Sequence, residues 1–166
     1  MGTEGAVAYC RYGGSREALP LVRLSVGFNQ PGDDTWVETW DYAVVDTASD
    51  GSWLPPAMLK GIGAWDYFDD VTTVDVTTVR GTEILRKGMW HLWCRVGSID
   101  LPWQVMFACS LSGESLSYPV LGQDVLSGLI GEFDGPTQRG RLIQDASGSR
   151  CAAVFRSWLG GARETG

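Results

Sequence analysis

Short runs that alternate apolar and polar residues, separated by turn-forming residues, constrain the fold of this chain most. Residues 22–28 alternate Val, Leu, Val and Phe with polar or small residues, as a strand with one buried face does. The stretch NQPGDDT at 29–35 contains a Pro-Gly pair and predicts a turn. WVETWDYAVV at 36–45 is rich in aromatic and β-branched residues and predicts the returning strand.

Helical periodicity is scarce, and 22 glycines interrupt the chain. Strand composition recurs at 71–81, at 139–144 and across 86–109, where a turn is expected near Gly97-Ser98. The best helix candidate is 122–131, whose apolar Val125, Leu126, Leu129 and Ile130 fall on one helical face. A short helix is also expected within 54–65, and 149–161 suits a terminal helix ending at a glycine pair. The sequence therefore predicts a mainly β domain with one or two helices.

Bulk properties exclude several classes of function. The length of 166 residues suits one domain with a real core, and the net charge of -7 argues against a nucleic-acid partner. No apolar run approaches the length that crosses a membrane, and no basic region precedes an apolar core at the N-terminus, so a cytoplasmic protein is expected. The four cysteines (Cys10, Cys94, Cys109 and Cys151) lack close spacing, and His91 is the single histidine. We therefore expect reduced thiols, with a Cys94–Cys109 disulfide as the minority alternative, and neither a metal site nor a cofactor.

The stretch AVVDTASDGSWLP at 43–55 raises a question of function. Two valines lead, as a buried strand would, to Asp46, and a second acid, Asp50, follows in a turn. A carboxylate at the end of an apolar run is costly to bury. Asp46 therefore either caps a turn with its oxygens or is placed there for chemistry.

A second segment has a related pattern, and the two together carry a resemblance. Residues 118–136 bring apolar Val120 and Leu121 to Gly122 and then to the predicted helix. The motifs at 44–50 (VVDTASD) and 120–126 (VLGQDVL) together resemble the retropepsin-like aspartic proteases, the single-lobed family that includes the retroviral enzymes. The resemblance covers roughly 19–144 and implies a closed β-barrel with one short helix near 123–130. It leaves 1–18 and 145–166 as terminal extensions of unknown role.

The resemblance also implies a mechanism and a set of site residues. An acid protease needs two carboxylates that share one proton, and this chain has one Asp-Thr motif, so a symmetric homodimer acting on a peptide or protein substrate is implied. The implied roles are catalysis by Asp46, an active-site loop of Thr47, Ala48 and Ser49, and substrate binding by Asp50, Gly122 and Gln123. A flap is implied within 79–88, with either Arg80, Gly81 and Thr82 or Lys87 and Gly88 at its tip.

Two positions depart from the family pattern. Ala48 stands where the family has glycine, and its Cβ would crowd a backbone that passes the catalytic pair. Gln123 stands where the family has an arginine that pairs with the acid matching Asp50. A glutamine can still hydrogen-bond that carboxylate but supplies no charge.

Two other functions compete with an active endopeptidase. The first keeps the fold but loses the chemistry, which leaves a dimerisation or peptide-binding module; Ala48 favours it. The second drops the resemblance and predicts a β-barrel or sandwich that binds a small ligand or a carbohydrate through exposed tryptophans. The eight tryptophans flank strand-like stretches, and for most of them core packing is the default expectation.

Overall fold

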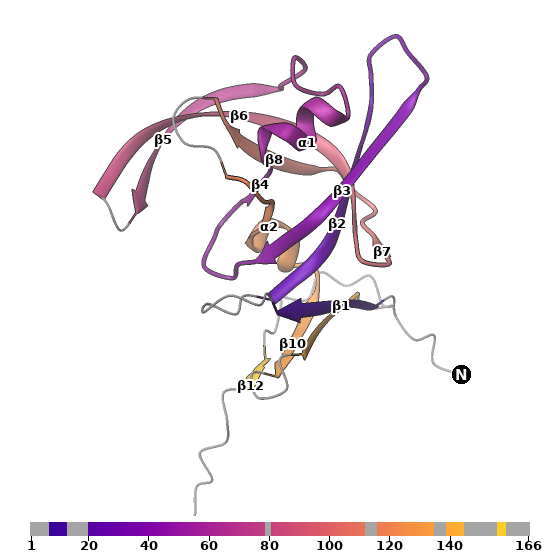
Figure 1. The fold of residues 1–166 in the computed structure, drawn as a ribbon, viewed down its shortest axis with the longest axis vertical. Helices are drawn as coiled ribbons and strands as arrows, with labels where there is room; N and C mark the ends of the chain where they lie inside the picture. Colours follow the sequence, from indigo (N-terminus) through magenta and orange to yellow (C-terminus); the bar gives the residue numbers. More distant parts are fainter. Residues whose placement is uncertain are drawn as a thin grey trace, which may run out of the picture.

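The computed structural model describes residues 7–12, 20–78, 81–111, 116–134, 139–144 and 156–158. Most of them lie in β-strands, as Figure 1 shows. The strands are β1 (Val7–Tyr12), β2 (Pro20–Asn29), β3 (Trp36–Val45), β4 (Ser52–Trp53), β5 (Asp70–Thr78), β6 (Gly81–Val96), β7 (Ile99–Asp100), β8 (Val105–Ser110), β9 (Val120–Leu121), β10 (Ile130–Asp134), β11 (Arg139–Ile143) and β12 (Arg156–Trp158). The helices are α1 (Pro56–Gly61) and α2 (Gln123–Leu126).

Six strands close into a barrel. The pairing order runs β2-β3-β9-β4-β8-β6, and β6 pairs back onto β2 with Leu24 opposite Val96 and Val26 opposite Cys94. β2 and β3 form a long antiparallel hairpin whose register runs from Leu21 opposite Val44 to Asn29 opposite Trp36. The mainly β fold and the closed barrel expected from the sequence are therefore confirmed.

The alternation in β2 explains how the barrel is filled. Val22, Leu24 and Val26 are fully buried, together with Leu92 and Val96 of β6, because alternate side chains of a strand point to one face. Both helices add to this core: Met58 and Leu59 from α1 and Val125 and Leu126 from α2 are buried. Each buried aliphatic side chain contributes roughly 1.5–3 kcal/mol to the free energy of folding.

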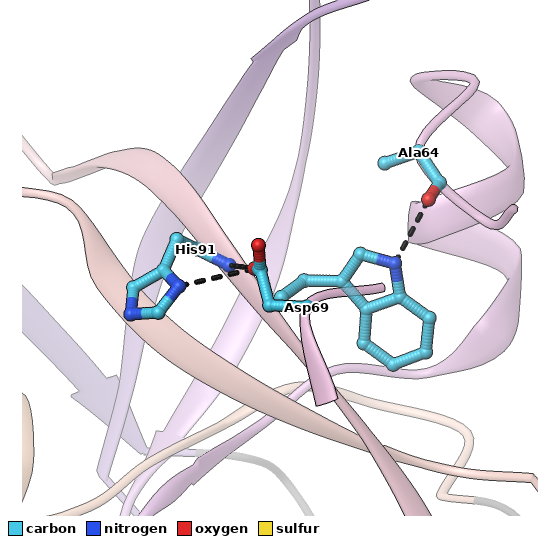
Figure 2. Close-up of polar contacts among 4 residues, drawn as sticks. Ala64, Asp69 and His91 are labelled. Atoms are coloured by element: carbon cyan, nitrogen blue, oxygen red, sulfur yellow. Dashed lines mark hydrogen bonds and ion pairs between the residues drawn. The ribbon is translucent and has the colours of Figure 1, made fainter. Parts of the chain in front are cut away.

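The segment after α1 is fixed to β6 by polar contacts around Trp90, which Figure 2 shows. The Trp90 indole is buried and its Nε1 donates a hydrogen bond to the Ala64 carbonyl over 2.8 Å. Next to it, the exposed Asp69 carboxylate accepts the backbone N–H of His91 at 2.8 Å and lies 3.0 Å from His91 Nδ1. His91 therefore faces outward between buried Trp90 and Leu92, because successive side chains of a strand point to opposite faces.

Two groups of strands extend from the barrel. β5 pairs with the first half of β6, from Asp70 opposite Met89 to Thr78 opposite Gly81, and this hairpin reaches away from the barrel in Figure 1. At the other side, β11 pairs with β1 and β10, and β1 joins this group to β2. β1, which comes from the predicted N-terminal extension, thus belongs to the same continuous sheet as the barrel.

Two helix predictions need correction. The stretch 149–161 was expected to suit a helix, but Arg156–Trp158 form β12, which pairs in parallel with Glu132–Asp134 of β10. The rest of that stretch lies outside the described residues. The helix expected over 122–131 is shorter, because α2 ends at Leu126 and the chain must reach β10 in register with β11, with Ile130 opposite Ile143. Tertiary strand pairing overrides the helical period in both places.

The strand region 86–109 and the tryptophans also differ from expectation. The turn at Gly97-Ser98 is confirmed, but the second strand is interrupted: β7 ends at Asp100 and β8 begins at Val105. The expectation that the tryptophans pack in the core is wrong for most of those whose side chains the structure describes. Trp90 is 1% exposed, Trp53 and Trp65 are half-buried, and the exposed fractions are 49% for Trp36, 51% for Trp40, 42% for Trp93 and 39% for Trp103.

Cys94 and Cys109 are free buried thiols, so the minority disulfide between them is wrong. Burial raises the pKa of Cys94 to about 12, with a further contribution from the negative charge of Asp124. Burial likewise raises the pKa of Cys109 to about 11, although the charge of Lys60 opposes it. Both groups are therefore protonated thiols at neutral pH and slightly above. The side chains of Cys10 and Cys151 lie outside the described residues.

Alkylation should reveal this protection. Because the thiolate is the reactive form and both groups are shielded, iodoacetamide at pH 8 should label Cys94 and Cys109 roughly 100-fold more slowly in the native protein than in the urea-unfolded chain. Site-resolved mass spectrometry over time measures both rates. Equal rates in the two states would contradict the burial of these cysteines.

Within the described part of the chain, neither helix is long and apolar enough to cross a membrane.

Candidate functional site

The predicted site is built where β3 ends beside β9. Val44 and Val45 pair in parallel with Val120 and Leu121, and β9 also contacts β4 through Trp53 opposite Val120. β9 thus lies between two strands that are consecutive in the chain. The backbone N–H of Asp46 continues the ladder by donating to the Leu121 carbonyl over 3.0 Å. The two sequence motifs, more than 70 residues apart, therefore meet side by side.

Asp46 begins a tight turn and takes part in it. Its Oδ1 accepts the backbone N–H of Ala48 over 2.9 Å, and its carbonyl accepts the N–H of Ser49 over 3.3 Å. An aspartate that bonds the backbone two residues further on is common turn chemistry. The capping role considered from the sequence is therefore present, and the half-buried carboxylate still lies at the surface.

The rest of the loop is mostly exposed. Thr47, Ala48 and Asp50 are exposed, whereas Ser49 is half-buried and its hydroxyl donates to the Gly51 carbonyl over 2.7 Å. The loop is thus held by bonds of its own backbone and hydroxyl groups while it presents Thr47 and Ala48 to solvent.

Gln123 joins the two segments in a way the sequence did not predict. Its backbone N–H donates to the Ser49 carbonyl over 2.8 Å, and its side-chain Nε2 donates to the Thr47 carbonyl over 2.7 Å. The expected partner was the Asp50 carboxylate, but Asp50 contributes its carbonyl, which accepts the N–H of Asp124 over 3.2 Å. An amide group can donate to either kind of acceptor, and here Gln123 fixes the loop backbone instead.

Gly122 is required by a close backbone approach. A Cβ added there would lie 2.4 Å from the Gly51 carbonyl oxygen, 2.6 Å from the Gly51 carbonyl carbon and 2.7 Å from the Ser49 oxygen. These are backbone atoms, which cannot rotate away. Gly122 therefore allows the loop after Asp46 to pack directly on the start of α2.

A polar pair at this junction, formed by buried Ser52 and exposed Asp124, was missed by the sequence analysis. Ser52 is fully buried; its hydroxyl donates to Asp124 Oδ1 over 2.6 Å and accepts the N–H of Gly122 over 2.9 Å. The backbone N–H of Ser52 donates to Asp124 Oδ2 over 3.1 Å, so the carboxylate is bound at both oxygens. The signal was weak: Ser52 follows an unremarkable SDG turn, and Asp124 sits in a helix start where acids are common.

Replacing this serine should loosen the junction. Ser52→Ala leaves the buried N–H of Gly122 without its acceptor, and a buried group left unpaired costs about 1–3 kcal/mol. We therefore expect the free energy of unfolding in urea to fall by about that amount. The matched control is Ser117→Ala at an exposed position, for which a change within about 0.5 kcal/mol is expected. Equal effects of the two variants would contradict the role assigned to Ser52.

The predicted flap lies at the tip of the β5–β6 hairpin. Gly81 and Thr82 begin β6 and pair with Thr78 and Thr77, whereas Arg80 lies outside the described residues. In Figure 1 this tip stands well apart from α2. The structure thus brings the two motifs together but leaves the flap candidate at a distance in the single chain.

Comparisons with known proteins identify no relative: no family model, no curated protein and no solved structure matches this chain. Within the described residues, no group of three or more His, Cys, Asp or Glu side chains is arranged to hold a metal ion.

Proposed function

We propose that the protein is an aspartic endopeptidase that acts as a homodimer through paired Asp46 carboxylates. The observation that supports this most is the junction of the two motifs: the N–H of Asp46 donates to Leu121, and the N–H of Gln123 donates to Ser49. The retropepsin-like family packs its two corresponding loops side by side, and an accidental likeness of two short motifs would give no reason for that contact.

The chemistry follows from two carboxylates held together. Like charges a few ångströms apart cannot both ionise at low cost, so the pair shares one proton. The ionised Asp46 takes a proton from the attacking water, and the protonated Asp46 of the other chain polarises the peptide carbonyl. Because each chain supplies one such aspartate, the site is complete only across a two-fold axis.

The exposed surface of the loop is compatible with this assembly. Thr47 and Ala48 are exposed in the single chain, so a second copy can approach them without unfolding either barrel. The bonds from Gln123 to Thr47 and from Ser49 to Gly51 hold the loop in one conformation before the partner arrives. Such preorganisation lowers the entropy cost of association.

A catalytically inactive dimerisation or peptide-binding module is the second candidate. One contact favours it: Asp46 Oδ1 already accepts the Ala48 N–H, so the carboxylate has a structural role that does not need catalysis. The methyl group of Ala48 also stands where the family has none.

Cleavage and assembly together test the proposal. A denatured protein substrate should be cut at acid pH, and pepstatin should block the cutting. Sedimentation under the same conditions should report twice the 18.0 kDa mass of one chain. A dimer without pepstatin-sensitive cleavage would support the inactive module, and a strict monomer at high concentration would contradict both.

A further inference from the structure

Three exposed tryptophans lie on the outer face of β2, β3 and β6. Trp36 and Trp40 come from β3, and Trp93 comes from β6 on the other side of β2. Between them, β2 carries small residues: Ser25 lies opposite Trp40 and Arg95, and Gly27 lies opposite Glu38 and Trp93. Small residues between large neighbours leave a hollow along the central strand, with one wall from each flanking strand.

The Trp36 indole lies over Gly27 at the floor of this hollow. A Cβ at Gly27 would lie 1.9 Å from Cζ2 and 2.4 Å from Cη2 of the Trp36 indole, so the ring occupies the space above the Gly27 backbone. A glycine in the middle of a strand weakens it and commonly marks a close approach. Here that approach places the benzo ring of Trp36 against the β2 backbone, while 49% of the residue stays exposed.

The hollow is a pocket of about 230 Å³. Its floor is Ser25 and Gly27, and Trp36 and Trp93 line it together with the polar side chains of Glu38, Arg95 and Asp100. Pockets for drug-sized ligands usually measure roughly 300–1,000 Å³, so this one suits a single ring. Apolar faces combined with a few polar groups are the usual composition of a binding site for a small molecule.

The charged side chains at the rim pair with one another. Arg95 Nε donates to Asp100 Oδ1 over 2.6 Å, and Arg95 Nη1 lies 4.0 Å from Glu38 Oε1. An anionic ligand would meet two carboxylates on a chain with a net charge of -7, and a cationic one would compete with Arg95 for those same carboxylates. A neutral ligand avoids both costs, and the planar charged groups can still exchange hydrogen bonds with its hydroxyl groups.

From this arrangement we propose that the Trp36–Trp93 pocket binds one ring of a neutral saccharide. A pyranose ring has an apolar C–H face that packs on an indole and a rim of hydroxyl groups that both donate and accept. Glu38 and Asp100 accept from those hydroxyls, and Arg95 donates to them. The pocket lies on the outer wall of the barrel, and saccharide binding there does not depend on the endopeptidase activity proposed above.

Calorimetric titration of the intact protein tests this directly. The probes are cellohexaose, maltohexaose, mannohexaose and the hexamer of N-acetylglucosamine, each up to millimolar concentration. At least one should bind, and its affinity should change little between 50 mM and 500 mM NaCl because the ligand carries no charge. Choline chloride and a proline decapeptide serve as contrasting probes for an aromatic cage and for a polyproline groove.

Variants assign any binding to the pocket. Trp36→Ala and Trp93→Ala should each lower the affinity for the saccharide roughly tenfold or more, since tryptophan contacts that become buried on binding dominate small interfaces. Trp103→Ala is the matched control, because Trp103 is also exposed but packs near Gly128, outside the pocket. The affinity of this variant for the saccharide should match that of the wild type. Gly27→Ala should weaken binding although both indoles remain, because the new Cβ displaces the Trp36 ring. Circular dichroism confirms that each variant stays folded.

Three results would overturn the proposal. Failure of all four saccharides to bind overturns the proposal, as does binding that is tighter for choline or for the peptide. Saccharide binding that survives Trp36→Ala and Trp93→Ala also overturns it, because the ligand then sits elsewhere.

Discussion

Asp46→Asn should abolish acid proteolysis while the barrel stays folded. The change keeps the size and shape of the side chain, and the Asn oxygen can still accept the Ala48 N–H that Asp46 Oδ1 accepts over 2.9 Å. It removes the ionisable group that a proton-sharing pair requires, so the cleavage rate should fall by roughly 10³-fold or more. A fluorogenic peptide assay at acid pH measures the rate, and thermal unfolding of both proteins checks the fold.

Ala48→Gly completes this series. Ala48 is exposed, so removing its methyl group costs little packing, and glycine adds up to about 1 kcal/mol of conformational entropy cost. In the proposed dimer the Ala48 methyl groups of both subunits would face one cleft, so their removal would act twice per site, and activity should stay equal or rise. Equal cleavage by wild type and Asp46→Asn would place the activity elsewhere. If neither wild type nor Ala48→Gly cleaves, the inactive module is favoured.

Gly122→Ala should have the largest effect on stability. The new Cβ would overlap backbone atoms of Gly51 and Ser49 at 2.4 to 2.7 Å, and movement of Ser49 would break its bond from the Gln123 N–H. Overpacking against a rigid backbone should lower the free energy of unfolding by roughly 3 kcal/mol. Urea titration followed by circular dichroism measures the loss.

Gly51→Ala is the matched control for this change, because it lies in the same junction but an added Cβ there meets nothing within 4 Å. It should change the free energy of unfolding by less than about 1 kcal/mol. A Gly122→Ala protein as stable as Gly51→Ala would show that the two loops do not pack as closely as the structure has them.

The sequence predicts best where a local pattern decides the structure. The alternation at 22–28 predicts the strand β2 and the core-facing side chains Val22, Leu24 and Val26, because a period of two follows from strand geometry alone. It does not predict that Ser25 and Gly27 on the opposite face are buried as well. Sequence prediction fails where distant segments decide. Leu129 and Ile130 continue the helical spacing of apolar residues in the sequence, but pairing of β10 with β11 ends α2 at Leu126. At Arg156–Trp158, pairing with β10 likewise replaces the expected helix.

The candidate site shows the same limit. A motif comparison brought Asp46 and Gly122 together, but it did not reveal that Ser52 and Asp124 tie the junction, since these residues are 72 positions apart. The exposed tryptophans were also unpredictable. Strand composition does not say which face of β3 turns outward, and the Trp36 indole is accommodated only because Gly27 lies diagonally across on β2.

The stoichiometry of pepstatin binding tests the central claim most directly. If two Asp46 carboxylates from two chains form one site, calorimetry or native mass spectrometry at acid pH should find one inhibitor for every two chains. The same experiment on Asp46→Asn should show no pepstatin binding at the inhibitor concentration that saturates the wild type. One inhibitor bound per monomer, or undiminished binding to Asp46→Asn, would contradict a catalytic site shared across a two-fold axis.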